Sequence, residues 1–513
     1  MSTLQDNIAA LSTDPAQRLA GIRRGIEKEG LRVLPNGDLA LTPHPAALGS
    51  ALTHPHITTD YSESQIELIT GAHHGVQDCL DELTEVHQFV LRTLNQPAAP
   101  SDERLWVSSM PCRLPTDETI PLARYGNSNI GRTKSVYRMG LGHRYGRRMQ
   151  TICGIHYNWS LPGVGSEQYF GLIRNFRRQA FVLLYLFGAS PALGPCFAQG
   201  RPHALQRLSD QALYLPHATS LRMGSLGYQS DAQATLAVSY NSLQGYADSL
   251  HEALLRPYPA YEAVGVRNPG GDYNQLGTSL LQIENEFYGT IRPKRVIQPG
   301  ERPLHALRER GVEYVEVRLM DLDPFVPVGI TAQTMRLLDV FLLHCLLSDS
   351  PPDTPQEITE IKYNQHLTAA RGREPGLHLL RQGRNVALVD WAAEVLAECA
   401  PLAAALDATH HSSDYSAALA QAHSTLADAA HTPSARVLAQ MAAQHDNSFS
   451  AFTLHQSTLA RDALIALPWS EAQQAASAAQ AQASLAAQQA IEAADTLDFE
   501  AWRQQYMAAQ GLG

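Results

Sequence analysis

Acidic and other polar side chains recur at every second position of several segments that resemble β-strands. These segments are residues 23–34, 58–70, 148–162, 279–293 and 311–324. Residues i and i+2 of a strand point to the same face of a sheet. The pattern therefore predicts five pairs that share a face: Glu27 with Glu29, Gln65 with Glu67, His156 with Asn158, Glu284 with Glu286, and Glu316 with Arg318. The positions between them are largely apolar.

Two carboxylates at positions i and i+2 lie about 7 Å apart and repel each other by roughly 2–3 kcal/mol at an effective dielectric constant near 20. Water screens this repulsion on an open face, so a half-exposed antiparallel sheet explains any single segment. The repeated use of Glu favours a concave, partly dry face that holds a cation. Carboxylates with one imidazole suit Mg²⁺ or Mn²⁺ and do not suit Zn²⁺. Magnesium on several carboxylates is typical of phosphate chemistry.

No Gly-rich phosphate loop of the form G-x-x-x-x-G-K-[ST] occurs in the chain, so bound ATP would be held by metals and basic side chains. The candidates are Arg292 and Lys294, in the run IRPKR, and Arg318 beside Glu316. A solvated basic turn explains residues 291–295 equally well. No H-E-x-x-H, G-x-S-x-G or Cys/His pairing indicates a different chemistry.

Composition limits the class of protein. The chain has 513 residues, 17% of them charged, and a formal net charge of −11. General nucleic-acid binding requires an excess of cations, so this charge argues against it. The six cysteines form no C-x-x-C pair, the N-terminus has no secretory pattern, and the most apolar stretches, 181–193 and 340–347, are too short to span a bilayer. We expect a cytoplasmic protein that binds neither nucleic acid nor membrane.

The length allows about three domains or one large elaborated one. Helices are predicted for residues 1–20 and 75–95, and an Ala-rich helical region begins near residue 375. Residues 471–494 are almost only Ala, Gln and Ser, which predicts a surface helix. We expect a catalytic core at residues 1–375 and a helical C-terminal region at 376–513, packed together as one compact unit.

Taken together, these segments resemble glutamate–cysteine ligase (γ-glutamylcysteine synthetase) of the proteobacterial type over nearly the whole chain. The resemblance is carried by GIRRGIEKEGLRV, TTDYSESQIELIT, SMPC, YGNSNIGRTKSVYRMGL, GIHYNWSLP, SLRMGSLGY, LQIENEFYGTIRPKRV, GVEYVEVRLMDLDPF and AADTLDFEAW. It implies an α+β fold similar to that of glutamine synthetase. In this fold an antiparallel sheet forms a curved, funnel-like active site that is surrounded by helices.

The resemblance also implies roles for individual residues. The residues that would hold divalent metals around the ATP phosphates are Glu27, Glu29, Asp60, Glu67, His156 and Glu316. Arg318 would contact the transferring phosphate, so that Arg318, Glu67 and Glu316 form the catalytic set, and Arg222 would bind a substrate carboxylate. The wall of a cysteine site would consist of Tyr137, Leu141, Gln150, Ile152, Tyr228 and Tyr288. For Leu141 and Ile152 a simple core role is the alternative.

The implied reaction joins the γ-carboxylate of L-glutamate to the amine of L-cysteine through γ-glutamyl phosphate. It consumes ATP, requires Mg²⁺ or Mn²⁺, and yields γ-glutamylcysteine, ADP and phosphate in the first step of glutathione synthesis. The resemblance further implies a monomer and feedback inhibition by glutathione. Three alternatives stay open: a related ligase with another amine acceptor, glutamine synthetase-like ligation of ammonia, and a non-enzymatic metal- or nucleotide-binding regulator.

Overall fold

A seven-stranded antiparallel sheet lies at the centre of the computed structural model, which describes residues 4, 7, 15–96, 102–227, 231–234, 236–298 and 300–508. The strand order is β2-β3-β1-β5-β10-β9, and β4 pairs with β1. The strands are β1 (Arg23–Val33), β2 (Ile57–Thr59), β3 (Gln65–Ile69), β4 (Arg104–Leu105), β5 (Ile155–Ser160), β9 (Ile291–Lys294) and β10 (Tyr314–Met320). Four of the segments with alternating polar residues thus contribute neighbouring strands, which confirms the predicted antiparallel α+β fold.

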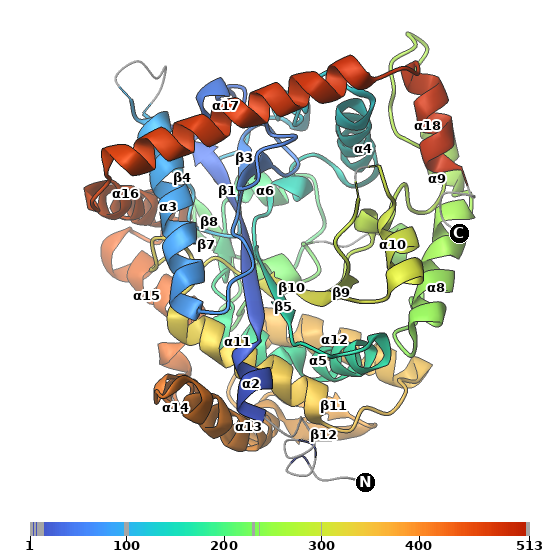
Figure 1. Cartoon of the computed structure of the whole chain (residues 1–513). Helices are drawn as coiled ribbons and strands as arrows, with labels where there is room; N and C mark the ends of the chain where they lie inside the picture. The colour runs from blue at the N-terminus through green and yellow to red at the C-terminus, as the bar shows by residue number, and fades with distance from the viewer. Residues whose placement is uncertain are drawn as a thin grey trace.

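Helices surround this sheet (Figure 1). Up to residue 371 they are α2 (Pro15–Ala20), α3 (Val76–Leu94), α4 (Asn129–Tyr145), α5 (Ser166–Phe187), α6 (Pro195–Ala198), α7 (Asp231–Ala234), α8 (Leu243–Leu255), α9 (Pro259–Val264), α10 (Pro303–Arg310), α11 (Ala332–Leu347) and α12 (Pro355–Arg371). Short 3₁₀ turns include η1 (Ala46–Leu48), η3 (Met149–Thr151), η4 (Leu221–Met223) and η5 (Glu284–Glu286). A small sheet contains β6 (Ala192–Leu193), β7 (Gln206–Ser209) and β8 (Ala212–Tyr214).

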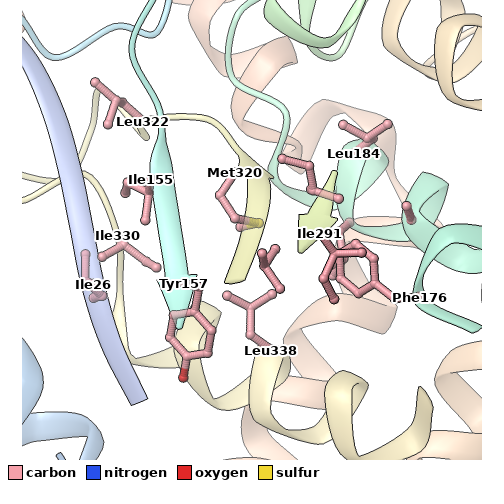
Figure 2. Packing of buried hydrophobic residues seen from close by; sticks show 14 of the residues in the cluster. Ile26, Ile155, Tyr157, Phe176, Leu184, Ile291, Met320, Leu322, Ile330 and Leu338 are labelled. Atoms are coloured by element: carbon pink, nitrogen blue, oxygen red, sulfur yellow. The ribbon is translucent and has the colours of Figure 1, made fainter. Parts of the chain in front are cut away.

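The apolar positions of the strands form the buried face of the sheet. Ile26 of β1, Tyr157 of β5 and Ile291 of β9 are inaccessible to solvent. Figure 2 shows them in one cluster with Phe176 of α5 and Leu338 of α11. Helix α3 contacts β1 and β3, and α5 contacts β9 and β10. Because successive side chains alternate between faces, this packing leaves the polar residues on the opposite face.

A buried ion pair joins the apolar face to α11. Nη2 of Arg24, on β1, lies 3.1 Å from Oδ2 of Asp339, on α11, and both side chains are fully buried. The hydroxyl of Tyr157 donates a hydrogen bond to the same carboxylate at 2.8 Å. Breaking a buried pair leaves an uncompensated charge, so this network favours a single orientation of α11 against β1 and β5.

The C-terminal region begins with the hairpin of β11 (His378–Arg381) and β12 (Arg384–Ala387). It continues with α13 (Leu388–His410), α14 (Asp414–Ala427), α15 (Pro433–Gln444), α16 (Phe449–Ala466), α17 (Glu471–Ala494) and α18 (Phe499–Met507). Helices α13 and α14 contact α11, α16 contacts α3, and α18 contacts α4. The division of the chain at residue 375 stays a prediction.

The predicted surface helix at residues 471–494 is α17, which crosses the top of the molecule in Figure 1. The hydroxyl of Ser484 accepts a hydrogen bond from the amide of Ser50 at 2.9 Å. Gly49 has a φ of 83°, and a Cβ at this position would collide with Ser484 Oγ. A glycine therefore allows the Ala-rich helix to lie directly on the core.

The structure differs from the predicted strands in three segments. Residues 58–70 are divided between β2 and β3 by a turn that carries Asp60, and β5 begins only after η3. In the segment 279–293, Glu284–Glu286 form the turn η5, so the predicted strand there is wrong. Short apolar and polar alternations do not by themselves distinguish a strand from such a turn.

The helix predicted at 75–95 is confirmed as α3, and α2 covers the end of the helix predicted at 1–20. Most of the residues before α2 lie outside the described part of the chain. Among the described helices, none combines the length and apolar character that a membrane span requires.

Replacing Asp339 by Ala leaves Arg24 as an unpaired buried charge, which costs about 3–5 kcal/mol. We expect this loss in the free energy of unfolding, measured with urea and circular dichroism. As a control, Asp414→Ala removes the half-exposed carboxylate that pairs with Arg336 at 2.7 Å, a type of pair worth at most about 1 kcal/mol. Equal losses in both variants would contradict the structural role of the buried pair.

Candidate active site

Strand register brings the predicted metal ligands to one face of the sheet. Glu27 of β1 lies opposite His156 of β5, and Glu29 of β1 lies opposite Glu67 of β3. Glu316 of β10 pairs with β5 two residues beyond His156. Because side chains alternate along each strand, these residues point away from the apolar face that packs on α5 and α11.

The side chains converge around His156. Its Nδ1 lies 3.2 Å from Oε2 of Glu27 and 3.9 Å from Oε1 of Glu316, and its Nε2 lies 3.7 Å from Oε1 of Glu29. One ligand atom from each of Glu27, Glu67 and His156 lies within 4.8 Å of the other two. This group of oxygen ligands with one imidazole could hold a metal ion of the Mg²⁺ or Mn²⁺ type.

One end of this cluster has an excess of negative charge. Burial, together with the charges of Glu27 and Asp60, raises the pKa of Glu67 well above its usual range. Burial and the charge of Asp60 also raise the pKa of Glu29 to about 8. The turn after β2 therefore brings Asp60 close to both carboxylates. A cation among these groups would relieve their repulsion.

Basic side chains offset the charge at the other end of the cluster. Nζ of Lys294 lies 3.2 Å from Oε1 of Glu316, and Nη1 of Arg318 lies 2.9 Å from Oε2. Burial alone would raise the pKa of Glu316, but Lys294 and Arg318 outweigh it and hold this pKa well below its usual range. Glu316 is therefore a carboxylate at neutral pH.

Arg292 of β9 lies opposite Glu316 in the register. Its Nη2 donates to the backbone carbonyl oxygens of Asn285, at 2.8 Å, and Phe287. The guanidinium thus supports the turn that replaces the predicted strand, and its role toward a nucleotide stays a prediction.

Glu284 and Glu286 do not join the metal cluster, contrary to the shared strand face that the alternation predicted. Oε2 of Glu284 accepts a hydrogen bond from Nη2 of Arg302 at 2.8 Å. Oε1 of Glu286 accepts hydrogen bonds from Nη1 of Arg144, at 2.8 Å, and from Tyr145, at 2.6 Å. Both glutamates are buried, and these ion pairs join the turn η5 to the start of α10 and to α4.

Arg222, in η4, lies next to the Arg318 end of the cluster. It is 2% exposed, and its Nη2 donates to the backbone carbonyl of Arg318 at 2.8 Å. A Cβ on Gly154 would collide with this guanidinium, and the amide of Gly154 donates to Glu29 at 2.9 Å. Sequence reasoning missed Gly154, although a glycine directly before a polar strand was an available signal.

Three of the residues predicted for the cysteine site lie near one another. Nε2 of Gln150 donates to Oη of Tyr288 at 3.0 Å. Burial and the charge of Glu286, with a smaller contribution from Tyr288, raise the pKa of the Tyr137 phenol well above its usual range. Tyr137 of α4 and Tyr288 are therefore close enough to interact electrostatically.

Leu141 and Ile152 are buried, at 6% and 0% exposure, so the alternative of a simple core role also fits them. Tyr228 lies outside the described residues. The roles of all three in a cysteine site stay predictions.

A cavity of about 90 Å³ lies where these groups meet. It is lined by His156, Arg222, Met223, Tyr288, Gly289, Thr290, Arg318 and Gln365. The cavity thus joins residues for which the sequence predicted three separate roles: metal binding, phosphate contact and substrate binding. Sequence reasoning missed Thr290, which lies in the segment 279–293 beyond its two paired glutamates, and Gln365, which lies on α12 outside the five segments.

Sequence reasoning also missed two cations of α4. Lys134 and Arg138 lie over the ring of Tyr125, at 5.1 and 4.7 Å from its centre. The hydroxyl of Tyr125 donates to the backbone carbonyl of Asp60 at 2.9 Å. Burial and the charge of Arg138 lower the pKa of Lys134 to about 8. The i, i+4 spacing of two basic residues in a helical segment was the available signal.

Comparison with known proteins agrees with this geometry. A family model described as "Glutamate-cysteine ligase" matches residues 8–368. The glutamate–cysteine ligase of Azotobacter vinelandii is 49% identical over 100% of both chains. The enzyme of Janthinobacterium sp. (strain Marseille) is 49% identical over 99% of this chain and 98% of that one.

Two solved structures extend the comparison. The glutamate–cysteine ligase of Francisella tularensis in complex with AMP is 36% identical and has a TM-score of 0.89. The match covers 96% of the present chain and 99% of the Francisella chain. A bifunctional glutathione synthetase from Pasteurella multocida shares the fold, with 23% identity and a TM-score of 0.69. This match covers 89% of the present chain and 55% of the Pasteurella chain. The family match, the full-length relatives and the close structural likeness confirm the resemblance: the chain belongs to the glutamate–cysteine ligase family.

Proposed function

We propose that this chain uses ATP to join the γ-carboxylate of L-glutamate to the amine of L-cysteine, with γ-glutamylcysteine, ADP and phosphate as products. The observation that carries the proposal is the convergence of Glu27, Glu67, His156 and Arg318 on one sheet face in a chain of the glutamate–cysteine ligase family. The AMP bound to the Francisella relative supports ATP as the nucleotide.

The donor set fits Mg²⁺, with Mn²⁺ as the alternative. The residues that would hold it are Glu27, Glu29, Asp60, Glu67, His156 and Glu316. These residues suit a cation because burial and neighbouring carboxylates raise the pKa values of Glu29 and Glu67. The protein supplies too few positive charges to offset these two carboxyl groups. When bound, the metal supplies positive charge to the phosphate oxygens of ATP.

The side chains around the small cavity then serve the first chemical step. Arg222 binds the α-carboxylate of glutamate and directs its γ-carboxylate toward Arg318. An oxygen of this γ-carboxylate attacks the γ-phosphorus of ATP, the bond to the bridging oxygen breaks, and ADP leaves. Arg318 offsets the charge on the transferring phosphoryl group, while Lys294 offsets charge nearer the nucleotide.

In the second step the free-base amine of cysteine attacks the acyl carbon of γ-glutamyl phosphate. A C–N bond forms, the C–O bond to phosphate breaks, phosphate leaves with the electron pair, and the nitrogen loses a proton. Tyr137, Gln150 and Tyr288 enclose the amino acid and keep water from the acyl phosphate. A different amine acceptor is the alternative, and it would depend on this same wall.

The direct test incubates the purified protein with ATP, Mg²⁺ and glutamate and measures ADP release while the amine acceptor varies. We expect the highest kcat/KM with cysteine, and γ-glutamylcysteine as the product identified by mass spectrometry. ADP release that does not respond to cysteine but responds to another amine would replace the proposal with the alternative.

Replacing Glu67 by Gln removes one charged oxygen ligand without changing the size of the side chain. We expect kcat to fall at least about 100-fold, as when an electrostatic contact to the transition state is lost, and Mn²⁺ affinity, measured by isothermal titration, to fall roughly 10–100-fold. The control Glu309→Gln changes an exposed carboxylate of α10 and should leave both unchanged. Near-normal turnover at saturating Mg²⁺ would remove Glu67 from the metal set.

Replacing Arg222 by Ala removes the proposed partner of the glutamate carboxylate. A hydrogen bond to a charged group contributes about 1.5–3 kcal/mol, so the KM for glutamate should rise about 10–100-fold, and the KM for ATP far less. For Arg222→Lys, which retains the charge, the KM for glutamate should lie between those of the native chain and Arg222→Ala. If neither Michaelis constant changes in a variant with normal thermal stability, Arg222 has another role.

Three further properties stay predictions of the family resemblance: feedback inhibition by glutathione, a monomeric state and a cytoplasmic location.

A further inference from the structure

The motif AADTLDFEAW, at residues 493–502, joins α17 to α18 and has no part in the chemistry proposed above. In Figure 1, α17 crosses the top of the molecule and α18 turns down beside α4, which it contacts. Helix α4 carries Tyr137 and Leu141, two residues of the predicted wall of the cysteine site. Residues 495–503, called here the C-terminal segment, thus pack on an element that supplies part of this wall.

The C-terminal segment is hydrogen-bonded to the first turn of α4. Oδ2 of Asp495 accepts a hydrogen bond from the amide of Asn129 at 2.5 Å, and the backbone carbonyl of Leu497 accepts one from Nδ2 of Asn129 at 2.9 Å. Asn129 is the first residue of α4 and is buried. The first amides of a helix have no partner within the helix. Asp495 therefore supplies a partner for one of them, and its negative charge is favourable at this end of a helix.

A second contact lies one turn further along α4. Nε1 of Trp502 donates to Oγ1 of Thr133 at 3.1 Å, and this hydroxyl in turn donates to the backbone carbonyl of Asn129 at 2.8 Å. Asn129, Thr133 and Tyr137 follow one another at intervals of four residues, so they lie on the same side of the helix. The contacts with the C-terminal segment therefore lead along α4 to Tyr137, which is about 6 Å beyond Thr133 along the helix axis.

The C-terminal segment also holds the part of the chain that leads to Tyr288. Nη1 of Arg503 donates to the backbone carbonyl of Leu276 at 2.7 Å. The amide of Leu276 donates to Oε1 of Gln282 at 2.9 Å, and Nε2 of Gln282 donates to the backbone carbonyl of Tyr137 at 3.3 Å. From Gln282 the chain continues through η5 to Tyr288. The two tyrosines of the predicted wall thus belong to elements that the same segment contacts.

We propose that the C-terminal segment positions α4 for binding of the amine acceptor, with Asp495 and Trp502 as positioning residues. The inference rests on the proposed function, in which this acceptor is L-cysteine and lies against the wall that includes Tyr137 and Tyr288. Neither positioning residue lines the small cavity of the site, so both act through α4.

Two substitutions test the two contacts separately. Asp495→Ala removes the carboxylate that bonds to the first amide of α4, and Asp495→Asn retains an oxygen acceptor in a side chain of the same size. Trp502→Phe removes the N–H group that bonds to Thr133 but retains an aromatic ring, so it decides the question if Asp495→Ala does not fold. The matched control is Ser484→Ala, which removes a hydrogen bond from the same C-terminal region to Ser50, outside α4.

We expect Asp495→Ala and Trp502→Phe to raise the KM for cysteine at least about fivefold, because a misplacement of about 1 Å far from the chemistry can cost about 100-fold in rate. The KM values for ATP and for glutamate should stay within about twofold, as for substitutions away from a binding site. Asp495→Asn should restore most of the affinity for cysteine. Ser484→Ala should leave the KM for cysteine unchanged, even where it lowers the melting temperature as much as Asp495→Ala does.

An unchanged KM for cysteine in both variants overturns the inference. Equal rises in all three Michaelis constants also overturn it, as does a rise in Ser484→Ala that matches the rise in Asp495→Ala, because each would indicate a general loosening of the fold.

The inference and the proposed function are tested by different measurements. The native chain alone tests the proposed function, through cysteine-dependent ADP release. The inference is tested only by the ratios between variants and native chain, measured with whichever amine the native chain accepts, so either can fail without the other.

Discussion

Repulsion among buried carboxylates is the constraint on which the rest of the site depends. Strand register places Glu29 opposite Glu67, and Glu27 beside both, on a face that is only partly open to water. The strand register must be fixed to keep these charges together, because a slip by one residue would turn the side chains of a strand to the other face. The apolar face supplies this rigidity through its packing on α3, α5 and α11.

The two ends of the cluster meet this constraint differently. At one end, Lys294 and Arg318 neutralise Glu316 and keep it ionised. At the other end, burial and neighbouring carboxylates raise the pKa values of Glu29 and Glu67, and a divalent cation would favour their ionised forms. The face therefore combines a carboxylate that is neutralised by the protein with carboxyl groups that the protein does not neutralise. Under the proposed function this arrangement suits the approach of phosphate groups and a carboxylate substrate.

A single glycine lies between the proposed metal ligand Glu29 and the proposed substrate-binding residue Arg222. The amide of Gly154 donates to Glu29, and the missing side chain of Gly154 leaves room for the guanidinium of Arg222, which in turn donates to the backbone of Arg318. A shift of the backbone at this position would thus move Glu29 and two arginines together.

The sequence by itself determined that polar side chains of β1, β3, β5 and β10 share one face of the sheet, because alternation is a local property with a period of two residues. Motif resemblance supplied the family and the role expected of Arg222. Only the tertiary structure decided that Glu284 and Glu286 pair with Arg302 and Arg144 instead of joining the cluster, because a local pattern does not reveal the distant cation that a buried carboxylate will meet. For the same reason the close approach of Arg222 to Gly154 became visible only when segments far apart in sequence were brought into contact.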